Sequence, residues 1–175
     1  ALHQSAVRRA LLPEHIIPYA LEGLDWMALG DDVLEVGPGP GLTTDLMRPS
    51  LARMTAIELD DVLARDLAAR LHDTNVTVEH GDATAMPFES NRFSAAVSFT
   101  MCHHVPTTAL QDQMFAEILR VLRVGGLFIA SDSVASEELA GLHEGDVYNP
   151  IDPGTLQDRL STIGFIEVQV RANDF

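Results

Sequence analysis

Residues 33–42 read VLEVGPGPGL, and this stretch decides the fold class. Val33 to Val36 is a short run with β-branched residues at both ends that predicts a buried strand, and the glycines after it predict a tight turn into a helix. The turn therefore follows the carboxyl end of a strand, which is where open α/β sheets bind their ligands. Glycines at this place also let a ligand approach the backbone closely.

The loop residues discriminate between two kinds of ligand. A dinucleotide-binding loop has the spacing G-x-G-x-x-G and cradles a pyrophosphate with backbone N–H groups. Here the glycines are one residue closer together, Pro38 and Pro40 have no N–H to donate, and the Glu35 carboxylate would oppose a phosphate. The loop is therefore predicted to bind a ligand that lacks phosphate and carries positive charge. The candidate binding residues of this loop are Glu35, Gly37, Gly39 and Gly41.

Strands and helices are predicted to alternate along the rest of the chain. Further strands are expected at 54–59, 76–79, 94–99, 127–131 and 166–170, and helices at 41–47, 61–71, 108–122 and 153–163. This alternation predicts a mostly parallel sheet with helices on both faces, which is a three-layer α/β/α sandwich.

Residues 1–29 are predicted to be a separate helical segment. Apolar pairs recur there at helical spacing, and Pro13 and Pro18 interrupt them, so two short helices are expected. We expect this segment to cover the ligand cleft as an N-terminal helical lid. Residues 30–175 are expected to form the ligand-binding part of what is a single domain overall.

The composition of the chain disfavours some classes of binding partner. The formal charge is −15, and a surface this acidic disfavours nucleic acid and anionic membranes as partners. No apolar run approaches the roughly 20 residues that span a bilayer, and the first residues lack the layout of a signal peptide. A cytoplasmic location is therefore expected. The single cysteine, Cys102, allows no disulfide within the chain.

With these motifs, the chain resembles the class I S-adenosylmethionine-dependent methyltransferases over roughly residues 33–170. It is similar to their small bacterial members, such as the quinone-biosynthesis C-methyltransferases. The resemblance implies a Rossmann-like sheet of order 3-2-1-4-5-7-6 and S-adenosylmethionine as the cofactor. It also implies that Glu35 lies near the cofactor's amino group. Glu58, with Leu59 beside it at the end of the second strand, would bind both ribose hydroxyls.

Two later positions match the cofactor site of the same family. Asp82 and Ala83 follow the third strand, where the resemblance implies that the aspartate accepts a hydrogen bond from the adenine amino group and the next N–H meets a ring nitrogen. The alternative for Asp82 is an Asx-turn. Ser98 and Phe99 end the fourth strand and are expected to contact the cofactor.

The part of the site that would bind the methyl acceptor is less well defined by the sequence. Methyl transfer from a sulfonium mainly requires alignment, and a general base is needed only when the acceptor must lose a proton. His103 and His104 are then the best candidates for the base, and the alternative is that they only pack or bind backbone. His143 and Tyr148 are candidates for lining the acceptor pocket. No metal site is predicted, because no other residues at metal-ligand spacing accompany the pair of His103 and His104.

The predicted function is transfer of a methyl group from S-adenosylmethionine to a small-molecule acceptor. The alternatives are a non-catalytic S-adenosylmethionine-binding module, a nicotinamide-dependent oxidoreductase and an aminopropyl transferase. The sequence identifies neither the acceptor nor the oligomeric state.

The end of the sheet carries a separate prediction. In the family, a seventh, antiparallel strand inserts beside the fifth. Only residues 171–175 follow the predicted sixth strand, which is too short for a turn and a strand of about five residues. We therefore expect the last strand to be missing. Continuation of the natural chain beyond Phe175 is favoured over a gapped six-stranded sheet, which would leave backbone groups unsatisfied.

Overall fold

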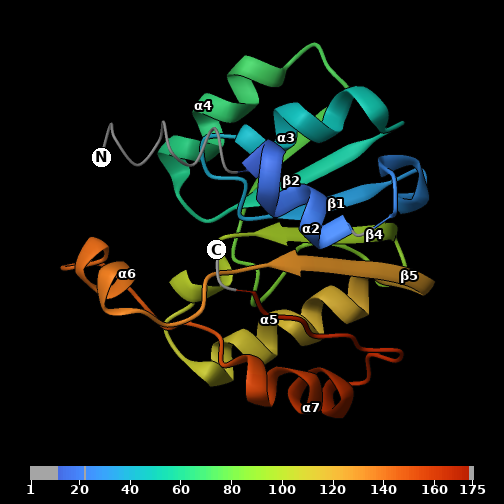
Figure 1. The fold of residues 1–175 in the computed structure, drawn as a ribbon. Helices are drawn as coiled ribbons and strands as arrows, with labels where there is room; N and C mark the ends of the chain where they lie inside the picture. Colours follow the sequence, from blue (N-terminus) through green and yellow to red (C-terminus); the bar gives the residue numbers. More distant parts are fainter. Residues whose placement is uncertain (1–11, 22, 174–175) are drawn as a thin grey trace.

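The computed structural model describes residues 12–21 and 23–173 (Figure 1). Five strands form one sheet in the order β3-β2-β1-β4-β5, and every neighbouring pair is parallel. The strands are β1 (Val33–Val36), β2 (Met54–Glu58), β3 (Val76–His80), β4 (Phe93–Phe99) and β5 (Leu122–Ser131). The predicted order 3-2-1-4-5 and the Rossmann-like class are thereby confirmed.

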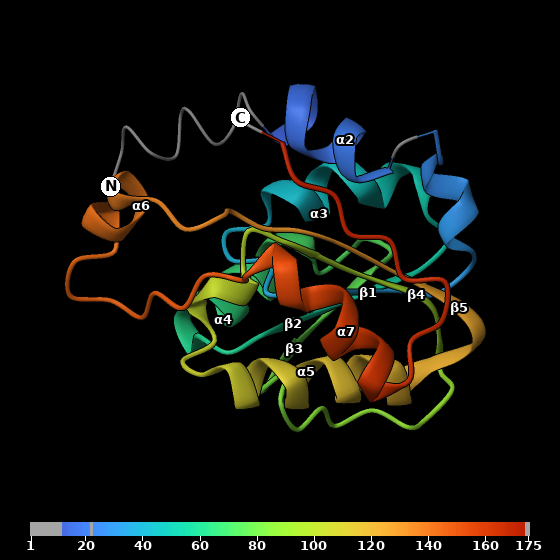
Figure 2. The same cartoon turned by 60° about the horizontal axis from the view of Figure 1, so that its bottom comes forward.

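Helices cover both faces of the sheet (Figures 1 and 2). One face carries α2 (Ile17–Leu21), α3 (Leu42–Met47) and α4 (Asp61–Leu71), and the other carries α5 (Thr108–Val121) and α7 (Pro153–Ile163). The remaining short elements are the π-helical turn η1 (Leu12–Ile16), the 3-10 helices η2 (Trp26–Leu29), η3 (Arg48–Ser50) and η4 (Cys102–His104), and α6 (Glu137–Leu142). The arrangement is the predicted three-layer sandwich. None of the helices in the described part of the chain has the length and apolarity needed to cross a bilayer.

The central strands are buried on both sides, which divides the core in two. Val33 of β1 packs with α2, α3 and α4, whereas its neighbour Leu34 packs with α5 and α7. Ala95 and Ala96 of β4 alternate in the same way, and all four residues are fully buried. Burial on both faces is typical of a parallel sheet and explains why these strands have so few polar side chains.

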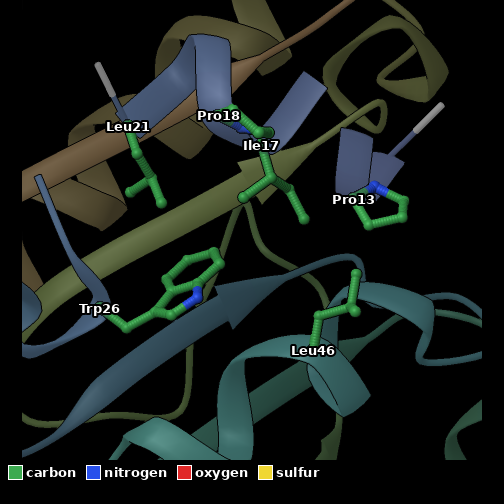
Figure 3. Close-up of a pocket in the computed structure, with 6 residues that line it drawn as sticks. All are labelled: Pro13, Ile17, Pro18, Leu21, Trp26 and Leu46. Carbon is green, nitrogen blue, oxygen red and sulfur yellow. The ribbon is translucent and has the colours of Figure 1, made fainter. Parts of the chain in front are cut away.

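The N-terminal segment packs on the α3 side of the sheet. Ile17 and Leu21 of α2 are buried in the same core cluster as Val33. A cavity of about 260 Å³ remains between this segment and α3 (Figure 3). It is lined by Pro13, Ile17, Pro18, Leu21, Trp26 and Leu46. Residues 1–11 and 22 of the predicted lid lie outside the described residues.

The fifth strand is longer than predicted. β5 begins at Leu122, immediately after α5, and not at Leu127. Phe93 pairs with Leu122 and Ala95 pairs with Leu127, so the residues between them form a bulge in the ladder. Gly125 has a φ of 79°, a backbone conformation that glycine adopts without steric cost.

The predicted sixth strand at residues 166–170 is wrong, because this segment forms no strand. Glu167 has a φ of 55°, which interrupts the extended backbone that a strand needs, and Ile166 is 84% exposed. The segment instead runs toward α2, where the Arg171 guanidinium donates to the Tyr19 carbonyl at 3.2 Å. Up to Asn173, no antiparallel strand pairs with β5, as expected for a sheet without its usual last strand.

Candidate cofactor and acceptor site

The strand order brings the predicted site residues to one edge of the sheet. β1 lies between β2 and β4 and is parallel to both, so the loops after the three strands emerge together. The order in which successive strands are added to the sheet also reverses between β1 and β4. Folds of this kind usually bind their ligands at such a point. The glycine loop after β1 and the histidines after β4 are therefore neighbours.

The glycine loop packs directly against the residues around it. Gly37, Gly39 and Gly41 have φ values of 69°, 56° and 83°, so all three adopt a left-handed conformation. A β-carbon on Gly37 would lie 2.1 Å from Cγ of Met101, and one on Gly41 would lie 2.4 Å from Cδ1 of Leu67. At these two positions the backbone conformation and the available space both require glycine.

Glu58, the last residue of β2, holds this loop. Its Oε2 accepts the backbone N–H of Gly39 at 2.9 Å, and its Oε1 accepts the N–H of Asp60 at 3.0 Å. A carboxylate has about four lone-pair positions, so two positions remain for further donors such as a pair of vicinal hydroxyls. Leu59, the next residue, is 66% exposed and offers an apolar surface beside the carboxylate.

Glu35 of β1 is a buried carboxyl group. It is 2% exposed, and its Oε2 accepts a hydrogen bond from the Thr44 hydroxyl at 2.5 Å. Burial raises the pKa of Glu35 to about 7, and hydrogen bonds from Thr44 and Thr43 oppose this rise. A carboxyl group with this pKa readily loses its proton and becomes negatively charged when a cation binds nearby.

Asp82 and Ala83 follow β3 at the same edge of the sheet. Oδ1 of Asp82 accepts both the N–H and the hydroxyl of Thr84 at 2.8 Å, which is the Asx-turn that the sequence left open as an alternative. Asp82 is exposed, and Ala83 is partly buried against the core. Their contact with an adenine ring stays a prediction.

Ser98 and Phe99 lie deeper than a ligand-contacting surface would require. Ser98 is fully buried, and its hydroxyl donates to the Val36 carbonyl at 3.4 Å. The Phe99 ring is 5% exposed and packs in the core beneath α2 and α3. Contact of these two residues with the cofactor stays a prediction, and the backbone at the end of β4 is the part best placed to make it.

Four ring side chains gather beyond the end of β4. His103 and His104 form most of η4, with ring centroids 4.2 Å apart. The His143 ring lies 5.0 Å from the first and 5.1 Å from the second, and Tyr148 stacks on His143 at 4.8 Å. The structure thus brings together all four residues that the sequence associated with the acceptor.

Asp132, which the sequence analysis missed, orients His103. One carboxylate oxygen is hydrogen-bonded to Nδ1 of His103, and the other accepts its backbone N–H at 3.0 Å. Both side chains are buried, with exposed fractions of 6% for His103 and 8% for Asp132. Asp132 directly follows β5, the neighbour of β4, so its position at a strand end was a signal available in the sequence.

A side chain of α5 holds the turn that carries His103 and His104. The Gln111 side chain donates to the Cys102 carbonyl at 3.1 Å and to the Asn149 carbonyl at 2.8 Å. The Asn149 N–H in turn donates to the His103 carbonyl at 2.7 Å. Burial raises the pKa of the Cys102 thiol, which favours packing over nucleophilic chemistry for this residue.

The chain matches a known family over residues 34–130, which include the glycine loop and the turn with His103 and His104. Residues 34–130 match the family model described as a methyltransferase domain, which is more than half of the chain. The chain therefore belongs to the methyltransferase domain family. S-adenosylmethionine is the cofactor that this membership implies.

Individual relatives agree on the family and differ in what they act on. The chain is 31% identical to a probable S-adenosylmethionine-dependent methyltransferase of Mycolicibacterium smegmatis over 102 residues, which are 58% of this chain and 38% of that protein. It is 28% identical to ribosomal RNA small subunit methyltransferase A of Bifidobacterium longum over 144 residues, 78% of this chain and 45% of that protein. The chain thus spans less than half of the length of these curated relatives.

A solved structure confirms the fold. The structure of a methyltransferase in complex with the Trm112 methyltransferase activator of Haloferax volcanii superposes with a TM-score of 0.73 at 15% identity. The match covers 95% of this chain and 80% of that one. The similarity to quinone-biosynthesis enzymes and the cytoplasmic location remain predictions.

The residues present fit S-adenosylmethionine. Two carboxyl groups, Glu35 and Glu58, flank the glycine loop and suit an ammonium and a pair of ribose hydroxyls. The guanidinium of Arg70, which contacts the loop, is already bound to Asp45 at 2.6 Å and to the Pro40 carbonyl at 3.0 Å. A site of this charge favours a cationic ligand over a dinucleotide phosphate.

Proposed function

We propose that this domain transfers a methyl group from S-adenosylmethionine to a small-molecule acceptor. The observation that carries the proposal is the pair of hydrogen bonds that Glu58 accepts from Gly39 and Asp60. They hold a carboxylate with two remaining acceptor positions against the glycine loop. When bound, S-adenosylmethionine supplies the methyl group on a sulfonium, which is a good leaving group.

The two carboxyl groups have different tasks in this proposal. Glu58 accepts both ribose hydroxyls through its remaining lone pairs, beside the exposed side chain of Leu59. Glu35 faces the amino group of the cofactor, directly or through water, and loses its proton as the ammonium arrives. Gly37, Gly39 and Gly41 let the backbone lie against the methionine part of the cofactor.

We assign the adenine of the cofactor to the residues that follow β3. Asp82 accepts a hydrogen bond from the adenine amino group while it keeps its turn with Thr84. The N–H of Ala83 donates to a ring nitrogen of the base. Ser98 and Phe99 border the cofactor through the end of β4.

The acceptor side is assigned to the cluster of rings beyond β4. His104, His143 and Tyr148 offer ring faces and polar atoms suited to a small molecule. The net charge of −15 opposes binding of a phosphate backbone, although several relatives are named as ribosomal RNA methyltransferases. We therefore favour a small-molecule acceptor over RNA.

Two measurements test the proposal. Calorimetry should show binding of S-adenosylhomocysteine and weaker or no binding of NAD, and the reverse order would overturn the cofactor assignment. Incubation with S-adenosylmethionine labelled in its methyl group should then label a compound in a small-metabolite extract. Labelling confined to ribosomal RNA added in parallel would overturn the acceptor class and leave the cofactor assignment intact.

A further inference from the structure

The three histidines of the acceptor side lie close enough together to share one metal ion. One ring nitrogen of each of His103, His104 and His143 lies within 4.8 Å of the other two. Nitrogen ligands bound to one Zn²⁺ at about 2.0–2.1 Å are roughly 3.3 Å apart, so the rings must move inward by about an ångström to close around an ion. We infer that these three side chains bind one divalent transition-metal ion of the zinc type.

The rings of His103 and His143 have the outer hydrogen bonds of metal-bound histidines. Nδ1 of His103 is hydrogen-bonded to the Asp132 carboxylate, and Nδ1 of His143 lies 2.7 Å from the Leu139 carbonyl oxygen. With Nδ1–H as the donor in both bonds, Nε2 is the unprotonated nitrogen that can bind an ion. Carboxylate and backbone carbonyl partners of this kind fix the tautomer and the ring orientation of metal ligands.

The surroundings favour a cation of this class. Imidazole nitrogens suit Zn²⁺, Cu²⁺, Ni²⁺ and Fe²⁺, whereas Mg²⁺ and Ca²⁺ prefer oxygen ligands. The negative charge of the whole chain and the nearby Asp132 carboxylate attract a positive ion. His103 is buried, and His104 and His143 are partly exposed, so the site has a buried floor and an accessible side.

This assignment replaces two expectations drawn from the sequence. The sequence predicted no metal and made His103 or His104 the candidate base if one is needed, whereas the structure brings the His143 ring from a distant segment to within 4.8 Å of both. Three protein ligands leave a coordination position open, as in catalytic zinc sites. That position would hold an oxygen or nitrogen atom of the acceptor, a role that rests on the proposed methyl transfer.

Binding of the metal alone tests the inference. Protein freed of metal by a chelator is dialysed against Zn²⁺, and elemental analysis should find one ion per chain. Co²⁺ added in its place should give the visible absorption of a cobalt ion with nitrogen ligands. His104→Ala and His143→Ala should each weaken Zn²⁺ binding by at least about 10-fold, and Asp132→Asn by about 10- to 100-fold.

Controls separate this site from unspecific binding. His72 is 81% exposed and far from the cluster in the chain, so His72→Ala should bind Zn²⁺ as the wild type does. The variants use the two partly exposed histidines, because loss of the buried His103 could disturb folding. Substoichiometric Zn²⁺, or wild-type affinity in His143→Ala, would overturn the inference. Calorimetry of S-adenosylhomocysteine binding to metal-free protein reports on the proposed function separately.

Discussion

The carboxylate of Glu58, the last residue of β2, accepts the backbone N–H of Gly39 in the loop after β1 at 2.9 Å. The bond links the loop after β1 to the end of β2 across the edge where the cofactor is proposed to bind. The same carboxylate also accepts the Asp60 N–H, at the start of α4. One side chain therefore both shapes the glycine loop and offers acceptor positions to a ligand.

Glu58→Ala should weaken the binding of S-adenosylhomocysteine by about 1.5–3 kcal/mol, the range for hydrogen bonds to a charged group. Calorimetry measures this change, and thermal melting checks that the fold survives. Asp61→Ala is the matched control, because it removes an exposed carboxylate three residues further along, where it pairs with Arg65. Unchanged affinity in a normally folded Glu58→Ala variant would show that the ribose assignment is wrong.

Glu35 should make stability fall as pH rises. Its folded-state pKa of about 7 lies above the ordinary value of 4.5, so the protonated group stabilises the fold below about pH 4.5, and this contribution is lost as pH rises through about 7. The loss from this one group should reach about 3 kcal/mol in the free energy of unfolding. Urea denaturation across this pH range should show a shallower decline for Glu35→Gln than for the wild type. Equal declines in the two proteins would contradict the raised pKa.

Gly37→Ala should destabilise the protein by about 1–3 kcal/mol, because an alanine there is strained at positive φ and its methyl group meets the Met101 side chain. Gly141→Ala is the control. Gly141 lies in α6, and a β-carbon there would have no neighbour within 4 Å. Chemical denaturation compares the two variants with the wild type. A Gly37→Ala variant as stable as Gly141→Ala would refute the close packing of the loop.

The N-terminal segment should respond to the cofactor. This segment and α3 line one cavity together, and α3 begins directly after the glycine loop. Amide hydrogen exchange in residues 12–29 should therefore slow when S-adenosylhomocysteine binds, as expected for a lid. Exchange in α7, on the opposite face of the sheet, serves as the reference. Unchanged rates in residues 12–29 would argue against a lid.

The sequence predicted the central sheet well, because its strands are buried on both faces and are bounded by glycines or turns. The failure at residues 166–170 has a physical reason. Ile166, Val168 and Val170 alternate with polar residues as in a half-buried strand, but alternation does not show whether a partner strand is present. The structure shows no such partner among residues 12–21 and 23–173, and Glu167 turns the backbone out of the extended conformation.

The sequence singled out residues that lie near one another in the structure, but it did not predict how they contact each other. Motif order was enough to single out Glu35 and Glu58, because each follows from its place on a strand. The contact of His103 with Asp132 and the approach of His143 depend on how β5 and the segment after α6 fold back. Local sequence carries no information on such long-range contacts, so the histidine cluster became visible only in three dimensions.

The contact between Gly37 and Met101 makes the two halves of the site mechanically dependent on each other. Met101 immediately precedes the turn with His103 and His104, and its side chain occupies the space where any other residue at position 37 would need a β-carbon. We therefore expect that a shift of that turn, when an ion or an acceptor binds, also displaces the glycine loop. Occupancy of one half should consequently alter affinity at the other, and thermodynamic reciprocity makes the effect equal in both directions.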